Sequence, residues 1–140
     1  MSKDILISLI TTDLAKSTAF YSAVGFINKA DTLDTSSGQM MWGDNITFML
    51  LSPELAETLN ERNKKIADQH TTVSVAFTLI LETKEEVDQF CNNAKLAGGK
   101  VYTTDQDPDE FCYSFEVEDP DGYILQPTYM DTSKIPNSIN

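Results

Sequence analysis

The sequence is poor in histidine and cysteine, which narrows the chemistry that it can support. His70 is the only histidine, and Cys91 and Cys112 are the only cysteines. A Ser–His–Asp set would have to use His70, which stands in a polar stretch without periodicity, so we interpret it as a solvated loop residue. The two cysteines form no CxxC pair, and we expect two buried, reduced thiols.

Basic residues are also scarce. Ten Lys and Arg stand against 22 Asp and Glu, which gives a formal net charge of −12. Binding to nucleic acid needs cations that neutralise phosphates, so we exclude nucleic acid as a partner. A field of this sign attracts cations and repels anions. We therefore expect any small organic ligand to be neutral or cationic.

Long apolar runs are absent as well. No run approaches the ~20 residues that a membrane span needs. The opening stretch, MSKDILISLITTD, has an acid before its apolar run and lacks a small-residue cleavage site, so it does not resemble a signal peptide. We expect a cytoplasmic protein without a membrane partner, folded as a single domain over residues 1–140.

The first part of the chain has the pattern of one strand, one helix and three strands. The helix is expected over residues 12–25, with Thr12 or Asp13 as its N-cap and Gly25 as its C-terminal stop. A short helix follows at Ser52 and Pro53. The strand-like runs lie at 4–10, 26–31, 38–43 and 46–52.

The same order starts again after a polar linker at 61–72. A helix capped by Thr83 and Glu86 follows the first strand of this second part. The expected strands lie at 72–81, 100–104, 110–118 and 123–130. The duplication predicts two βαβββ modules, at about 4–60 and 72–131, before a polar tail at 132–140. Each module must bury the sheet face that its helix leaves open. We therefore predict an α+β fold in which a curved mixed sheet encloses a concave cleft, with the helices on the convex side.

Three segments carry a resemblance to a known family. They are TTDLAKSTAFYSAVGF in the first module, LETKEEVDQF followed by AGG in the second, and EDPDGYIL with YMD behind it. With these segments the chain resembles the vicinal oxygen chelate superfamily, which includes glyoxalase I, bleomycin-resistance proteins and extradiol dioxygenases. It is most similar to a bacterial branch of predicted lactoylglutathione lyases. The resemblance spans about residues 4–131 and implies the fold, whereas the activity does not follow from the fold.

The resemblance also implies four metal-ligand positions, one on each of four strands, where metal-dependent members carry His, Gln or Glu. These positions correspond here to Leu6, Met49 or a neighbour, Ala76 and Gln126. Leu6 and Ala76 cannot bind a metal, and methionine is a soft ligand suited to other ions. Gln126 alone keeps a donor oxygen. We therefore expect no metal and no cofactor, and we assign no catalytic residue.

Strand alternation extends this set to the expected cleft. If Leu6, Ala76 and Gln126 point inward, so do their neighbours two positions away. Trp42 and Tyr113 lie on strands near the expected walls, and ordinary core packing is the alternative for both. The expected ligand-binding residues are Leu6, Ser8, Trp42, Met49, Ala76, Thr78, Tyr113, Ile124 and Gln126.

Three functions remain open from the sequence. The leading hypothesis is a protein of the bleomycin-resistance type that binds a small organic molecule without a metal. The second is a metal-dependent lyase or isomerase of the glyoxalase type, in which a register shift brings in Glu110, Glu116 or Glu118. The third is an interaction protein with a vestigial cleft. Sheet edges left uncovered by one chain also predict a homodimer.

Overall fold

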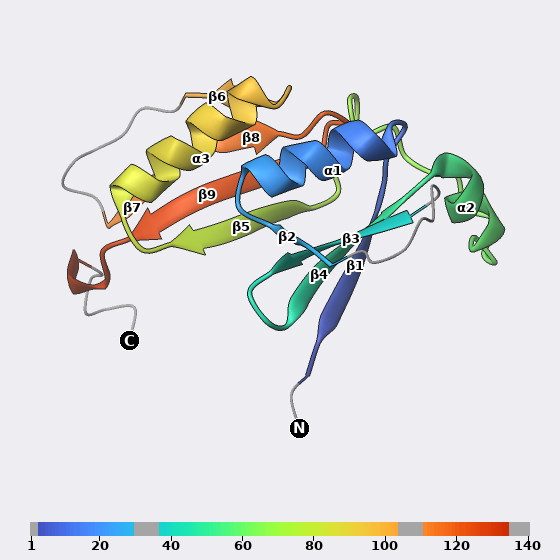
Figure 1. Cartoon of the computed structure of the whole chain (residues 1–140), viewed down its shortest axis with the longest axis horizontal. Coiled ribbons are helices and arrows are strands. Elements are labelled where there is room, and N and C mark those ends of the chain that lie inside the picture. Colours follow the sequence, from blue (N-terminus) through green and yellow to red (C-terminus); the bar gives the residue numbers. More distant parts are fainter. Residues whose placement is uncertain (1–2, 30–36, 104–110, 135–140) are drawn as a thin grey trace. The chain divides into compact units, whose positions relative to one another are not determined.

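The computed structural model describes residues 3–29, 37–103 and 111–134 (Figure 1). The chain divides into two compact units, Met1–Thr72 and Val73–Asn140, so the boundary falls at the end of the predicted linker. Each unit contains a mixed sheet and a helix on one of its faces, which confirms the α+β class and the two βαβββ modules. The concave cleft stays a prediction from the sequence.

Unit 1 has a four-stranded sheet in the order β1-β4-β3-β2. Strand β1 is parallel to β4, and the other two pairs are antiparallel. Strand β1 is therefore an edge strand, and β4 is central although it is the last strand of the unit. The elements are β1 (Ile5–Ile10), α1 (Leu14–Ala23), β2 (Ile27–Asn28), β3 (Ser37–Trp42), β4 (Ile46–Leu51) and α2 (Pro53–Thr58).

Helix α1 covers one face of this sheet. Its N-cap is Asp13, whose carboxylate accepts a hydrogen bond of 3.0 Å from the backbone N–H of Lys16. The fully buried ring of Tyr21 packs edge-on against Phe48 of β4, with ring centroids 5.6 Å apart. At Gly38 of β3, a Cβ atom would lie 3.4 Å from a methyl group of Leu14, so helix and strand approach closely there. The core of unit 1 lies between α1 and this face.

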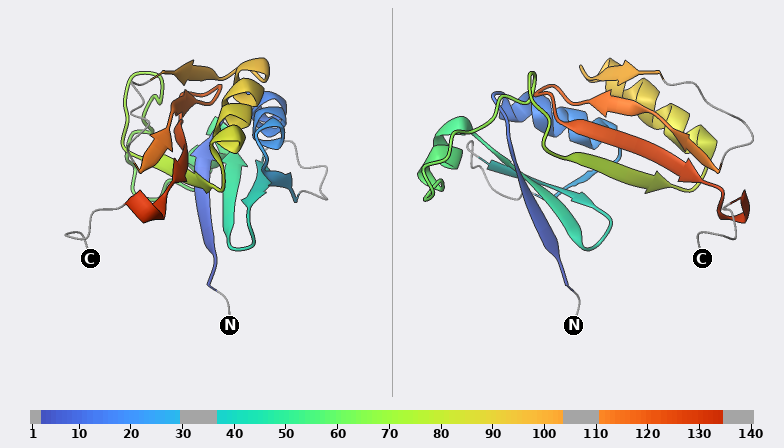
Figure 2. Two further views of the ribbon diagram at one scale, coloured as in Figure 1. Left: turned by 90° about the vertical axis from the view of Figure 1, so that its left-hand side faces the viewer. Right: turned by 180° about the vertical axis from the view of Figure 1, so that it is seen from behind.

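Unit 2 repeats the arrangement with one further strand. Its sheet has the order β5-β9-β8-β6, and β7 also pairs with β9. Strands β5 and β9 are parallel, so β9 corresponds to β4 of unit 1. Figure 2 shows α3 on one side of the sheet, where it packs on β9 and β6. The elements are β5 (Ala76–Leu81), α3 (Lys84–Leu96), β6 (Lys100–Tyr102), β7 (Cys112–Ser114), β8 (Glu116–Glu118), β9 (Ile124–Met130) and a 3-10 turn (Thr132–Lys134).

Helix α3 has the cap and the apolar stripe that its sequence predicts. The hydroxyl group of Thr83 accepts a hydrogen bond of 3.1 Å from the backbone N–H of Glu86. The carboxylate of Glu86 in turn accepts one of 2.9 Å from the N–H of Glu82, which satisfies a second free donor at the helix start. The buried residues of α3 are Val87, Phe90, Cys91 and Ala94.

Both cysteines are free, as expected, but only one is buried. Burial, aided by the charge of Asp88, raises the pKa of Cys91 to about 11, so this thiol stays protonated at neutral pH. Cys112 is half-exposed on β7, which corrects the expectation of two buried thiols. Among the described helices, none combines the length and the apolar character needed to cross a membrane.

Candidate functional site

Unit 1 presents a sheet face that points away from α1. In β1, Leu9 is buried on the α1 side, so Leu6 and Ser8 project from the opposite face. Ser8 pairs with Met49 in the parallel register, which places these two side chains together. We call this the Ser8 face, and its members are Leu6, Ser8, Ile10, Met49 and Leu51. Three of the expected ligand-binding residues therefore share one face.

Unit 2 presents the equivalent face, which points away from α3. Its register pairs Ala76 with Ile124 and Thr78 with Gln126. The hydroxyl group of Thr78 donates a hydrogen bond of 2.9 Å to the amide oxygen of Gln126. We call this the Gln126 face, and its members are Ala76, Thr78, Ile124 and Gln126. Four further expected residues therefore also share one face.

Trp42 lies on the helix side of the sheet in unit 1. It stands four positions after Gly38 in β3 and so shares the face that α1 covers. Its ring packs on Phe26, with centroids 5.0 Å apart. The packing alternative accounts for this residue, and we leave Trp42 out of the candidate ligand surface.

Tyr113 likewise lies on the helix side in unit 2. Its hydroxyl group donates a hydrogen bond of 2.6 Å to a carboxylate oxygen of Asp88 in α3. The ammonium group of Lys84 stands 5.6 Å from the centre of the ring. The hydrogen bond to Asp88, followed by burial, raises the pKa of Tyr113 to about 12. This side chain ties β7 to α3, so we leave it out of the candidate ligand surface as well.

The four metal-ligand positions implied by the resemblance carry a donor set that does not fit a metal. Leu6 and Ala76 are hydrocarbon, and Met49 offers a thioether. The amide oxygen of Gln126 already accepts the bond from Thr78. Within the described parts of the chain, no three His, Cys, Asp or Glu side chains come together as a metal site.

The Gln126 face nevertheless has a carboxylate close to Gln126. Strands β7 and β8 pair with β9 in one continuous register, in which Ser114 faces Thr128 and Val117 faces Leu125. This register puts Glu116 opposite Gln126. The register shift considered from the sequence for Glu116 is therefore not needed. Glu118 faces Ile124 on the same side. Of the three glutamates considered from the sequence, Glu110 lies outside the described residues.

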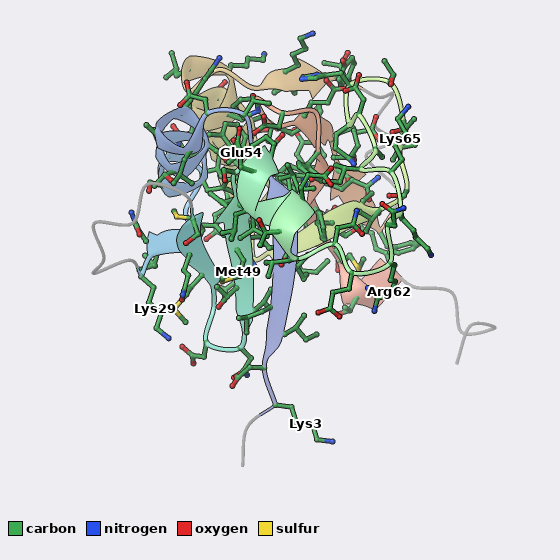
Figure 3. All side chains as sticks on the ribbon, turned by 90° about the vertical axis from the view of Figure 1, so that its right-hand side faces the viewer. Lys3, Lys29, Met49, Glu54, Arg62 and Lys65 are labelled. Carbon is green, nitrogen blue, oxygen red and sulfur yellow. The ribbon has the colours of Figure 1, made fainter. Side chains whose placement is uncertain are left out.

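A pocket of about 420 Å³ opens on the Ser8 face of unit 1. Ser8, Ile10 and Leu51 contribute from the sheet. Helix α2, capped by the hydroxyl group of Ser52 and begun by Pro53, contributes Ala56. The segment after α2 completes the wall, and Figure 3, which looks onto α2, labels two of its basic residues. The residues from this segment are Leu59, Asn60, Arg62, Lys64, Lys65 and Ile66.

A tight turn shapes this segment. The backbone N–H of Asn63 donates to the carbonyl of Asn60 at 3.4 Å, and the side-chain amide of Asn60 donates to the carbonyl of Lys64. Asn63 has a φ of 53°, a left-handed conformation that asparagine tolerates better than most residues. Sequence reasoning treated 61–72 as a linker and missed this wall, because the segment has no periodicity. The cluster RNKK at 62–65, shortly after the short helix α2, is the signal that marks it.

A second pocket, of about 260 Å³, lies at the start of α3 in unit 2. Thr83, Lys84 and Tyr113 line it together with Tyr129 and Asp131. Since Tyr113 lies on the helix side of the sheet, this pocket belongs to neither the Ser8 face nor the Gln126 face. Its lining mixes both charge signs, with Glu82, Glu85 and Asp131 against Lys84 and Lys134. It therefore favours no ligand class by charge.

Comparison with protein families identifies the fold. The model of the Glyoxalase/Bleomycin resistance protein/Dioxygenase superfamily matches residues 6–126, from β1 to Gln126 in β9. The chain belongs to this superfamily. The resemblance noted in the sequence is thereby confirmed, and the matched range begins and ends on two of the four ligand positions.

Several solved structures share the fold. A hypothetical protein from S. aureus is 27% identical, with a TM-score of 0.75 over 92% of this chain and 95% of that one. A lactoylglutathione lyase from Agrobacterium tumefaciens is 20% identical, with a TM-score of 0.65 over 92% and 94%. The fosfomycin resistance protein FosX from Listeria monocytogenes is 16% identical, with a TM-score of 0.68 over 96% and 98%. A search of functionally curated proteins gave no match.

Proposed function

We propose that the chain binds a small organic molecule in the pocket on the Ser8 face, and that it does so without a metal. The pocket itself is the observation that carries this proposal. Its volume of about 420 Å³ falls in the ~300–1,000 Å³ range that is typical of small-molecule sites. Half of the lining is apolar, and all of the polar lining residues except Ser8 lie on the segment after α2. Such a surface suits an organic molecule with one polar end.

The superfamily supports a small-molecule role. Two of its members with this fold are named as a lactoylglutathione lyase and a fosfomycin resistance protein, and both names refer to small organic compounds. The donor set at Leu6, Met49, Ala76 and Gln126 separates this chain from metal-dependent members. Binding without metal chemistry is the activity that remains compatible with both observations.

A ligand screen tests the proposal. Organic molecules of drug size are screened by thermal shift, and each hit is mapped by ¹H–¹⁵N NMR spectra of the labelled protein. We expect hits that move the amide signals of Ser8, Ile10, Leu51 and residues 56–66. A ligand at 100 times its Kd raises the free energy of unfolding by about 2.7 kcal/mol, which a thermal shift detects readily. Hits that move only signals from unit 2 would contradict the proposal.

A second candidate is a metal-dependent lyase or isomerase, and one observation favours it. Glu116 stands opposite Gln126, so a carboxylate and an amide lie side by side on the Gln126 face. Carboxylate oxygens are suitable ligands for divalent ions, and a glutamate can also act as a base. Elemental analysis of protein purified without chelator tests this candidate. It requires a stoichiometric divalent ion that Glu116→Gln removes.

A further inference from the structure

Three of the basic residues of the chain meet at one pocket. The chain has only ten Lys and Arg. Arg62, Lys64 and Lys65 all line the pocket on the Ser8 face, and no Asp or Glu is among its described lining residues. No described carboxylate forms an ion pair with any of the three side chains. The pocket therefore carries a local charge opposite to the net charge of the chain.

The other half of the pocket lining is apolar. Ile10 and Leu51 come from the sheet, Ala56 from α2, and Leu59 and Ile66 from the segment that follows. Leu51 and Ala56 are buried, whereas the side chain of Leu59 is 60% exposed. An exposed leucine at the mouth of a pocket gains most from contact with an apolar group. Apolar and cationic parts thus face one common volume.

We infer that the ligand of this pocket is an amphipathic anion, with an apolar body and a carboxylate, sulfonate or phosphate group. This inference rests on the proposed function, because it names the class of ligand for the same site. The apolar body contacts the sheet and α2, and the anionic group meets Arg62, Lys64 and Lys65. The guanidinium of Arg62 matches the two oxygens of such a group in its planar geometry.

The net charge of −12 favours a cationic ligand, whereas the basic residues of the pocket favour an anionic one. The distance of each set of charges from the ligand decides which effect is larger. At physiological salt, charges separated by more than about 8 Å are largely screened from each other. A bound anionic group therefore responds to the cations that line its pocket more than to acids elsewhere. The expectation of a neutral or cationic ligand rests on the net charge alone. Comparing an anionic with a cationic and a neutral probe tests it against the inferred anion.

Three probes with one ring system separate the head groups. 2-Naphthoate is anionic, 2-naphthylmethylammonium is cationic, and 2-naphthylmethanol is neutral. Each is titrated into ¹⁵N-labelled protein at low salt, and the amides of residues 8–10, 51 and 56–66 report binding in the pocket. We expect 2-naphthoate to bind there about 10-fold or more tighter than the ammonium probe, with a ratio that falls as salt rises.

A matched pair of variants shows where the preference arises. The pocket variant carries Arg62→Gln, Lys64→Gln and Lys65→Gln. The control variant carries Lys3→Gln, Lys16→Gln and Lys29→Gln, which makes the same charge change in the same unit at exposed positions that do not line the pocket. In Figure 3, Lys3 and Lys29 lie away from α2. We expect the pocket variant to bind 2-naphthoate about 10-fold more weakly and the control variant to bind it within about 2-fold of the parent.

The possible outcomes distinguish the inference from the proposed function. Equal binding of the alcohol and the carboxylate at the pocket amides overturns the inference and leaves the proposed function standing. Tighter binding of the ammonium probe at the same amides also overturns the inference and leaves the proposed function standing. Equal losses in both variants overturn the inference, because the whole-chain charge then explains the preference. If no probe moves the pocket amides, the inference and the proposed function are both overturned.

Discussion

Thr78 and Gln126 face each other on neighbouring parallel strands, and the Thr78 hydroxyl group donates its hydrogen bond to the amide oxygen of Gln126 over 2.9 Å. This oxygen is the one donor oxygen that the chain keeps at the four ligand positions implied by the resemblance to its superfamily. A metal ion at Gln126 would have to compete with Thr78 for it. The amide nitrogen of Gln126 is a hydrogen-bond donor and cannot bind a metal ion.

We predict that protein purified without chelator contains well below one equivalent of zinc, nickel or manganese, and that it has no glyoxalase I activity. Three or four protein ligands normally hold such an ion, and one neutral amide cannot replace them. Elemental analysis and a lyase assay check this. Near one equivalent of metal, lost on Gln126→Ala or on Glu116→Gln, would overturn the prediction and make the lyase the leading function.

Ser17 provides a test of packing in unit 1. Its side chain is buried in α1, and its hydroxyl oxygen has no hydrogen-bond partner among the described residues. We predict that Ser17→Ala raises the free energy of unfolding by about 1 kcal/mol, because a buried unpaired hydroxyl is removed and alanine favours the helix. Denaturant unfolding measures the change. Ser22→Ala on the exposed side of the same helix serves as control, since it isolates the helix-propensity part, and an equal gain in both variants would contradict the burial argument.

The bond between Tyr113 and Asp88 predicts a pH dependence of stability. The pKa of Tyr113 is raised from 10.0 to about 12 in the folded state, so folding favours the protonated phenol. The stabilisation is therefore fully present below pH 10 and is lost as the pH rises towards 12. We predict that Tyr113→Phe lowers the free energy of unfolding by about 1 kcal/mol at pH 8, and that this difference from the parent shrinks between pH 10 and pH 12. Unfolding curves over this pH range measure it.

A spectroscopic control accompanies this measurement. Absorbance of the phenolate follows the tyrosines directly, and Tyr113→Phe should remove the component that titrates near pH 12. Asp88→Asn keeps the tyrosine but removes the charged acceptor, so it should return that component towards pH 10. A titration curve unchanged by both variants would mean that the bond does not hold in solution.

We predict a homodimer in solution. Strands β1 and β5 are edge strands, and they leave apolar side chains in solvent, with Leu6 61% and Ile80 55% exposed. Uncovered edges of this kind invite pairing with a second chain. Sedimentation should give a species of twice the 15.6 kDa chain mass at micromolar concentration. A single species at the chain mass would count against the dimer, and Leu6→Lys should weaken the dimer if β1 lies in the interface.

Local signals in the sequence predicted much of the fold. The cap of helix α3 at Thr83 and its buried stripe could be predicted because both depend on residues within one or two helical turns. The turn at Asp119–Gly122 is equally local. The Asp119 carboxylate accepts hydrogen bonds of 2.9 Å from the N–H groups of Asp121 and Tyr123, and Gly122 takes the positive φ of 99°.

The parts that the sequence did not predict depend on longer-range placement. In β3, apolar side chains occupy both faces near Trp42, so alternation does not say which side it takes. The position of Glu116 opposite Gln126 follows from the register of β8 on β9, which is a tertiary property. The basic wall at Arg62–Lys65 lacks any repeating pattern, and only its contact with the sheet makes it part of a pocket.

The parallel pairing within each unit has a consequence for how the chain acquires its structure during synthesis. Ile5 finds its partner only at Ile46, and Ala76 finds its partner only at Ile124. Because the last strand of each unit is also the central one, the first strand stays unpaired until β4 in unit 1, or β9 in unit 2, has left the ribosome. Contacts that are so distant in sequence form slowly. A nascent chain stopped before β9 would therefore contain every strand of unit 1, whereas β5, β7 and β8 of unit 2 would still lack their common partner.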